Sequence, residues 1–368
     1  MTSCFEVFGL KKVINASGKM TALGASSVSE EVAFALKEAA QGYVEMDELI
    51  KFAGTIIASR TGAEDGCPTA SASAGIAIAT AATITGTNLS LIERMPQSAG
   101  LKNEVIIQKG QLVHYGANIG QMIRLGGGKV MEVGAANKVE KEHIEDTITD
   151  QTAALFYVKS HHAVQKGMQP IDVMVDLAAK YHIPLIIDAA AEQDFQHYIK
   201  MGADIVVYSG AKALAGPTSG FLCGKRNWMA ACRAQYKGIG RAMKVGKESV
   251  AGLIAALQQQ TSHEKTLEEQ REQMSVMCEA LNKLTGLACS LHMDEAGRTI
   301  CRAQIKVQEE AGITAAQLQE KLEKGNPAIY LRHHYANVGL LYVDPRPLLP
   351  GDEAIIVKEI TKILQEGK

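Results

Sequence analysis

One lysine follows closely on a hydrophobic run and precedes a turn rich in glycine and proline. The segment is IVVYSGAKALAGPTSGFLCGK, residues 205–225, in which Ile205–Tyr208 is expected to form a buried strand and Lys212 comes just after it. An amine withdrawn from water has a lowered pKa and becomes nucleophilic, which suits it to Schiff-base chemistry. An ordinary exposed loop lysine is the alternative, and Lys212 by itself favours that alternative.

An aspartate stands at the end of the preceding hydrophobic run. In PLIIDAAAE, residues 184–192, Asp188 comes 24 residues before Lys212. Two consecutive parallel strands joined by one crossover would bring both residues to the same edge of a sheet. A carboxylate there can pair with a protonated pyridine nitrogen and so maintain pyridoxal 5'-phosphate (PLP) as an electron sink. A helix cap is the alternative for Asp188, so only the pair of residues indicates this chemistry.

A third segment offers a place for a phosphate. Thr69–Gly75 (TASASAG) opens an alanine-rich stretch that is expected to be a buried helix. Small residues let a phosphate approach the backbone N–H groups at the positive end of a helix, and serine hydroxyls can add donors. Close packing would explain the same small residues equally well.

The elements that would position these residues alternate along the chain. Helical spacing of apolar residues predicts helices at 28–42, 47–60 and 171–180. Short apolar runs predict strands at Glu104–Gln108, Val130–Val133, Ala153–Val158, Pro184–Ile187 and Ile205–Tyr208. Continuous apolar strands separated by helices are typical of a parallel sheet covered on both faces, whose active sites lie at the carboxyl ends of the strands.

The remainder of the chain has a different texture. Residues 248–285 are expected to form one long helix, followed by strands in 300–307 and 330–343 and a helix in 352–365. We therefore expect three parts. They are residues 1–50, an N-terminal segment packing with a small domain; residues 51–247, a large cofactor-binding domain; and residues 248–368, a connecting helix and the small α/β domain.

Composition excludes several classes of protein. The 368 residues carry 38 Lys and Arg against 40 Asp and Glu, a net charge of −2, which argues against a nucleic-acid or acidic-membrane partner. The seven cysteines are scattered and never spaced as C-x-x-C, so we expect no metal site and a reduced, cytoplasmic protein. The uncharged stretch 66–92 is mostly Ala, Thr, Ser and Gly, which makes a poor membrane span.

Several segments resemble a known family. SGAKALAGPTSG (209–220), PLIIDAAAEQD (184–194) and RAMKVGKES (241–249) are similar to the selenocysteine-synthase-like branch of fold-type-I PLP enzymes. Within that branch, INASGKMTALG (14–24), ASAGIA (72–77) and KSHHAVQKGM (159–168) look most like D-glucosaminate-6-phosphate ammonia-lyases. The resemblance covers nearly the whole chain. It implies an aminotransferase-like α/β fold, with a mostly parallel central sheet between helices and a smaller α/β domain.

The resemblance also implies roles for particular residues. Lys212 would carry the Schiff base and Asp188 would contact the ring nitrogen. Around the cofactor phosphate would stand Ser71, Ala72, Ser73 and Ser209. His114 would stack on the ring or contact substrate, where the branch has an acidic residue, although an ordinary histidine at a strand end is an equal alternative.

Further residues are expected to reach the substrate. Ser160, His161 and His162 follow a core strand, and because side chains alternate in an extended chain, at most one of the two histidines should enter the site. Arg332, in AIYLRHHYANVG, lies where the family has a substrate-facing arginine, and a guanidinium suits a carboxylate. Lys244, in a basic cluster, would bind a substrate phosphate, with a solvated helix face as the alternative.

The implied activity is that of a carbon–nitrogen lyase. Lys212 would remove the α-proton of a phosphorylated amino sugar acid, and loss of water and then ammonia would leave a 2-keto-3-deoxy sugar-acid phosphate. A selenium transferase acting on seryl-tRNA is disfavoured by the net charge and by a catalytic-type sequence that begins by Leu10. Another PLP-dependent lyase or transferase, or a cofactor-free binding protein, remains as an alternative. The resemblance further implies a homo-oligomer.

Overall fold

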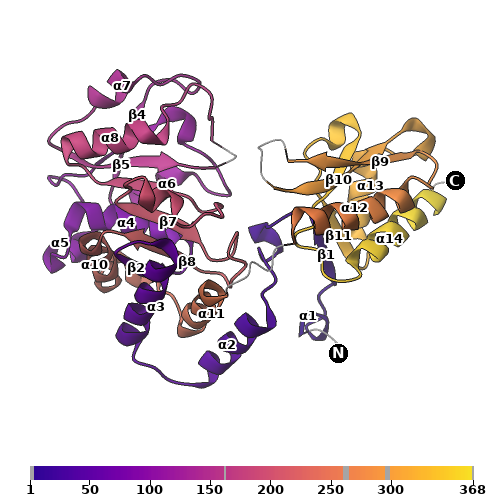
Figure 1. Cartoon of the computed structure of the whole chain (residues 1–368), viewed down its shortest axis with the longest axis horizontal. Coiled ribbons are helices and arrows are strands. Elements are labelled where there is room, and N and C mark those ends of the chain that lie inside the picture. The colour runs from indigo at the N-terminus through magenta and orange to yellow at the C-terminus, as the bar shows by residue number, and fades with distance from the viewer. Residues whose placement is uncertain (1–3, 161–162, 260–264, 295–298, 367–368) are drawn as a thin grey trace. The chain divides into compact units, whose positions relative to one another are not determined.

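The structure is a computed structural model that describes residues 4–160, 163–259, 265–294 and 299–366. The chain forms two compact units, a larger one of residues 28–261 and a smaller one of residues 1–27 with 262–368 (Figure 1). Each unit has its own sheet and its own hydrophobic core.

A seven-stranded sheet forms the centre of the larger unit. In spatial order its strands are β2 (Asp65–Thr69), β8 (Gly220–Gly224), β7 (Ile205–Ser209), β6 (Leu185–Asp188), β5 (Thr152–Val158), β3 (Glu104–Gln108) and β4 (Lys129–Val133). Strand β8 runs antiparallel to both its neighbours, and the other pairs are parallel. The five strands expected from the sequence are confirmed as β3 to β7, whereas β2 and β8 were not predicted.

Helices cover both faces of this sheet, as the alternating side chains of the interior strand β5 illustrate. From β5, Leu155 and Tyr157 belong to the core shared with α3 (Met46–Thr61), α8 (Ile171–Tyr181) and α11 (Lys247–Gln258). Phe156 and Val158 belong to the opposite core, shared with α4 (Ala72–Thr85), α6 (Ile119–Leu125) and α10 (Arg226–Ala234). The expected fold-type-I arrangement of a mostly parallel sheet between helices is confirmed. The remaining helices of the larger unit are α2 (Glu30–Gln41), α5 (Leu89–Arg94), α7 (Lys141–Glu145) and α9 (His197–Lys200).

The division into units differs from the expected boundaries at residues 50 and 247. Helix α2 packs along α11, and Lys247 Nζ donates hydrogen bonds to the carbonyls of Ala39 (2.6 Å) and Ala40 (3.3 Å) at the end of α2. Residues 28–50 and α11 therefore belong to the larger unit, and only residues 1–27 join the smaller one.

The long helix expected over 248–285 is wrong, because two helices occupy that range. Helix α12 (Leu267–Leu281) begins at its own capping box. The Thr266 hydroxyl accepts from the Glu269 N–H at 3.2 Å, and the Glu269 carboxylate accepts from the Thr266 N–H at 2.6 Å. This reciprocal pair is a strong start signal that separates α12 from α11.

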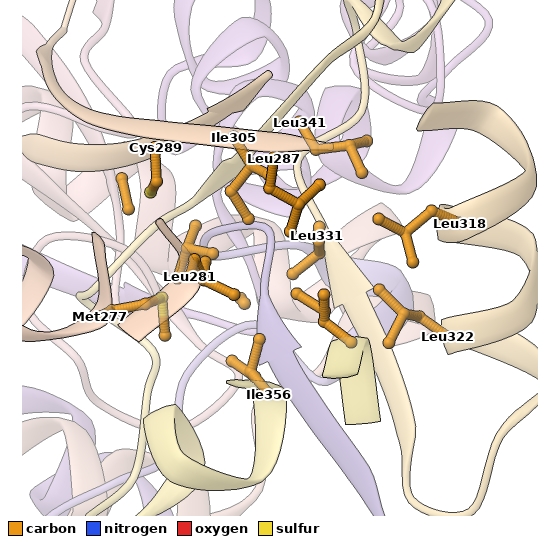
Figure 2. Close-up of a cluster of buried hydrophobic side chains, with 14 of the residues drawn as sticks. Met277, Leu281, Leu287, Cys289, Ile305, Leu318, Leu322, Leu331, Leu341 and Ile356 are labelled. Carbon is orange, nitrogen blue, oxygen red and sulfur yellow. The ribbon is translucent and has the colours of Figure 1, made fainter. Parts of the chain in front are cut away.

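The smaller unit packs helices against two small sheets. Its elements are α1 (Cys4–Val7), β1 (Val13–Ala16), α12, β9 (Leu287–Met293), β10 (Cys301–Val307), α13 (Ala315–Lys324), β11 (Ala328–Leu331), β12 (Leu340–Val343) and α14 (Asp352–Glu366). Strands β12, β10 and β9 form an antiparallel sheet, and β1 pairs with β11 in parallel. Figure 2 shows the core, in which Leu281, Leu322 and Ile356 from three helices meet Ile305 and Leu341 of the sheet.

None of the helices in the described ranges is long and apolar enough to cross a bilayer. The uncharged stretch 66–92 instead supplies β2, α4 and part of α5, and α4 has only 14 residues.

A buried group of charges lies within the smaller unit. Arg302, whose side chain is 4% exposed, contacts Asp294 at 2.7 Å and Asp344 at 3.2 Å, and Arg346 contacts Asp344 at 2.7 Å. Burial would raise the pKa of Asp344, but Arg346 and Arg302 outweigh burial and hold that pKa below its ordinary value. Arg302 thus bridges the two buried carboxylates, and Asp344 has Arg346 as a second partner.

Replacing Arg302 by alanine should therefore lower the free energy of unfolding by about 3–5 kcal/mol, because it leaves two buried carboxylates without their shared partner. Urea denaturation of the wild-type and variant proteins measures this loss. Lys324→Ala, which removes an exposed partner of Glu320, is the control and should change nothing measurable. An Arg302→Ala variant as stable as the wild type would contradict the assignment.

Candidate active site

Three strands place the candidate phosphate site at one edge of the larger sheet. Thr69 at the end of β2, Gly220 at the start of β8 and Ser209 at the end of β7 are paired in register. A Cβ on Gly220 would lie 2.5 Å from the Ser71 carbonyl carbon and 2.6 Å from the Ala72 nitrogen. Glycine thus lets the first turn of α4 rest directly on β8, one strand away from Ser209.

Hydrogen-bond donors gather at the start of α4. Ser71 caps the helix, its hydroxyl accepting from the Ala74 N–H at 3.0 Å, and the Thr69 hydroxyl donates to the Ser71 carbonyl at 2.9 Å. Ser73 lies in the first turn and donates to the phenol oxygen of Tyr115 at 3.2 Å. The helix dipole, the free N–H groups and the serine hydroxyls suit an anion such as a phosphate.

Asp188 and Lys212 interact electrostatically beside this edge. Asp188 ends β6, in register with Val158 of β5 and Val207 of β7, and is only 7% exposed. Burial raises the pKa of the Asp188 carboxyl to about 6, while the Lys212 charge and a hydrogen bond from the Ala190 N–H (3.1 Å) oppose that rise. The structure thus brings an amine and a buried carboxylate to the same end of the sheet.

A closed turn holds the base of Lys212. The Gly210 N–H donates to the Ser219 carbonyl at 2.9 Å, and the Gly216 N–H donates to the Gly210 carbonyl at 2.7 Å. A Cβ on Gly210 would lie 2.1 Å from Ser219 Oγ, and Ala215 adopts a left-handed conformation with φ of 53°. These contacts fix the backbone on both sides of the lysine.

Tyr115 is a site residue that the sequence reasoning missed. Burial raises the pKa of the Tyr115 phenol, and the charge of Asp188 adds to that rise. The hydrogen bond with Ser73 opposes it. The phenol therefore lies near both the start of α4 and the buried carboxylate. The predicted neighbour, His114, is exposed, and its Nδ1 accepts weakly from the Gly116 N–H at 3.4 Å. His114 pairs with Asn118 across a tight bend that contains Tyr115, and the sequence carries no signal of which side chain this bend turns inward.

The other expected residues of the larger unit lie in different surroundings. Ser160 follows β5 at the same edge, because the Lys159 N–H donates to the Asp188 carbonyl at 2.9 Å. The Ser160 carbonyl accepts from Gln165 Nε2 at 3.1 Å. His161 and His162 lie outside the described residues. Lys244 is exposed.

Arg332 belongs to the smaller unit. It follows β11, and its backbone N–H and carbonyl each form a 2.9 Å hydrogen bond with Tyr342. Its side chain is partly buried. In the part of the chain that the structure describes, no group of three or more His, Cys, Asp or Glu side chains is arranged to hold a metal ion.

Comparisons with known proteins show which proteins this chain is similar to. The family model of L-seryl-tRNA selenium transferase matches residues 13–324. The D-glucosaminate-6-phosphate ammonia lyase of Salmonella typhimurium (strain 14028s) is 46% identical over 364 residues, which cover 99% of this chain and 98% of the relative. The 5'-C-glycyluridine monooxygenase-decarboxylase of a Streptomyces species is 41% identical over 365 residues, covering 98% and 92%.

Solved structures give the same result. A structure of D-glucosaminate-6-phosphate ammonia-lyase superposes with a TM-score of 0.95 at 45% identity, covering 100% of this chain and 99% of that one. A cysteine desulfurase from Escherichia coli, 16% identical with a TM-score of 0.55 over 97% of this chain and 95% of its own, shares the fold.

The raised pKa of Asp188 predicts a stability change with pH in the protein freed of any ligand. Between about pH 4 and 6 the folded chain keeps a proton on Asp188 that the unfolded chain has lost, so the free energy of unfolding falls as pH rises through that window. Asp188→Asn abolishes this fall. Between about pH 4 and 6 the free energy of unfolding of the variant, compared with that of wild type, should therefore rise by about 3 kcal/mol, as measured by urea titrations.

Asp176→Asn, which changes an exposed aspartate of α8, is the control and should follow the wild-type curve. Parallel curves for wild type and Asp188→Asn would mean that burial does not govern this carboxylate.

Proposed function

The chain belongs to the L-seryl-tRNA selenium transferase family, and we propose that within this family it is a PLP-dependent ammonia-lyase. The substrate is a phosphorylated amino sugar acid of the D-glucosaminate-6-phosphate type, and the products are ammonia and a 2-keto-3-deoxy sugar-acid phosphate. The observation that carries this proposal is the similarity to the Salmonella ammonia lyase along essentially the full length of both chains.

The residues of the larger unit fit the cofactor. Asp188 is a carboxylate whose burial disfavours its ionised form. The protonated ring nitrogen of PLP is a cation that would stabilise that ionised form. Ser71, Ala72 and Ser73 at the start of α4, with Ser209 beyond Gly220, would hold the phosphate. When bound, PLP supplies an electron sink for charge that develops at the substrate α-carbon.

The protein's own groups would then move protons. The Lys212 amine, released when the substrate amine takes its place, would remove the α-proton. The resulting ammonium could return that proton to the departing β-hydroxyl, which leaves as water. Asp188 would stay ionised against the ring nitrogen throughout, and Tyr115, hydrogen-bonded to Ser73, would keep the space between carboxylate and phosphate site ordered. Hydrolysis of the remaining enamine gives ammonia and the keto acid.

Contacts to the rest of the substrate follow from chemistry. The Arg332 guanidinium suits the sugar-acid carboxylate, and Lys244 suits the terminal phosphate. His114, Ser160 and His161 complete the predicted set. We further propose that the protein is a homo-oligomer, with a small molecule rather than nucleic acid as its substrate.

A second candidate is an oxygen-dependent decarboxylation. It is favoured by the Streptomyces monooxygenase-decarboxylase, which resembles this chain over nearly the whole of its length. The products separate the two reactions, since decarboxylation releases carbon dioxide and consumes oxygen.

Activity assays test the proposal directly. The PLP-loaded protein should release ammonia and a 2-keto acid in equal amounts from D-glucosaminate-6-phosphate, without oxygen uptake. Unphosphorylated D-glucosaminate is the matched control and should react much more slowly, because it lacks the group that the basic side chains bind. Oxygen uptake with 5'-C-glycyluridine would favour the second candidate, and a gel shift with seryl-tRNA would favour a transferase. No turnover of the sugar-acid phosphate would remove the substrate assignment.

Replacement of Lys212 by alanine should abolish this turnover and the visible absorbance of the bound cofactor, because the amine that holds PLP is gone. Circular dichroism should show an unchanged fold, since the loop hydrogen bonds around position 212 are made by the backbone. Lys200→Ala, on an exposed surface of the same unit, is the control and should keep both colour and activity. A coloured, active Lys212→Ala protein would refute the assignment.

A further inference from the structure

Two cysteines of the smaller unit face each other in its core. Cys278 lies on α12 and Cys289 on β9, and their Sγ atoms are 2.8 Å apart. Both are free thiols, and both belong to the hydrophobic cluster drawn in Figure 2, where Cys289 is labelled. A disulfide bond is about 2.05 Å long, so these sulfurs would have to approach by less than about 1 Å to become bonded.

An asparagine clamp holds the two thiols in register. Asn282 lies one helical turn after Cys278, on the same face of α12. Its Nδ2 donates to the Cys289 carbonyl at 3.0 Å, and its Oδ1 accepts from the Cys289 N–H at 2.6 Å. On its other side Cys289 is in register with Ile305 of β10. These contacts hold α12 and β9 together, so the two thiols already lie next to each other before any reaction.

Both cysteines of the pair are buried, but less completely than the cysteines of the larger unit. Cys278 and Cys289 are 6% and 8% exposed, whereas Cys67, Cys223 and Cys232 of the larger unit are completely buried. Strand β9 is an edge strand of its sheet, with β10 on one side only.

We propose that Cys278 and Cys289 form a reversible disulfide when the protein meets a peroxide. One thiolate attacks the O–O bond of hydrogen peroxide, forming a sulfenic acid and releasing hydroxide, which is protonated to water. The second sulfur then attacks the first and expels a second water molecule. Two thiols and one peroxide become one disulfide and two waters, and a dithiol reductant reverses the change by exchange.

The contact between the two sulfurs couples their ionisation. It lowers the pKa of the Cys278 thiol and raises the pKa of the Cys289 thiol. Either sulfur can donate in this contact, so the geometry assigns the pair and not which sulfur attacks peroxide first. The cross-link would join α12 to β9 inside the smaller unit.

Peptide mapping tests the proposal on the PLP-loaded full-length protein. The test uses a Cys4→Ser background, because Cys4 is exposed and would form disulfides between molecules. After hydrogen peroxide treatment and alkylation of the remaining thiols, mass spectrometry should find a linked Cys278–Cys289 peptide pair lacking two hydrogens. Dithiothreitol should restore both alkylation sites.

Matched variants separate pairing from general reactivity. In Cys289→Ala, peroxide should carry Cys278 to sulfenic and higher acids, with no internal disulfide. Asn282→Ala keeps both thiols but removes the clamp, and should slow disulfide formation at least about tenfold if preorganisation drives it. A linked pair in wild type with unchanged kinetics in Asn282→Ala would overturn the role of the clamp.

Alkylation of both thiols after peroxide treatment, or a disulfide that joins either of them to Cys301, would overturn the proposal itself. The readout needs no substrate turnover, so it stands apart from the assigned lyase activity. If the cysteine variant does not fold, the wild-type peptide map still decides.

Discussion

The larger unit is organised around a carboxylate that burial keeps from ionising freely. Asp188 is 7% exposed, and among the described residues the Ala190 N–H and the charge of Lys212 support its anionic form. A cationic ring nitrogen, as in the proposed cofactor, would compensate such a buried carboxylate further. The parallel strands β6 and β7 bring the carboxylate and the amine to one edge of the sheet.

Close packing of α4 on the sheet brings the start of this helix to the same edge as that pair. A Cβ on Gly75 would lie 3.1 Å from Leu222 Cδ2 and 3.1 Å from Val207 Cγ1, so α4 sits tightly on β7 and β8. Together with Gly220, this packing places the positive, N-terminal end of α4 at the same edge as Ser209, the last residue of β7. Close packing, one of the two explanations that the sequence left open for the small residues of this segment, is therefore confirmed at Gly75 and Gly220, while its role in binding a phosphate stays a prediction.

What the sequence could predict depended on apolar runs. Strands β3, β5, β6 and β7 are runs of mainly apolar residues, so they were visible, and the shared edge of β6 and β7 followed from their order. Strand β4 (KVMEV) is only partly buried and was visible from its valines and methionine. Strand β2 (DGCPT) holds residues that disfavour strands, and its proline is tolerated because β2 lies at the edge of the sheet. The apolar run of β8 is short and has a glycine at each end, so it gave no clear strand signal. The inward position of Tyr115, rather than of its neighbour His114, is set by the fold of the loop and could not be predicted from the sequence.

The division of labour within the site explains how similar chains can carry different reactions. In the proposed reaction Lys212 and Asp188 would act at the α-carbon, a step that many PLP enzymes share, so they would not select among a β-hydroxyl, a carboxylate or another leaving group. Selection must come from groups that fix the remainder of the substrate and so decide which bond is aligned for cleavage. The relatives named for an ammonia lyase and for a monooxygenase-decarboxylase are similarly related to this chain. We therefore expect their difference to lie in the groups proposed to contact the remainder of the substrate, and not in the amine and carboxylate.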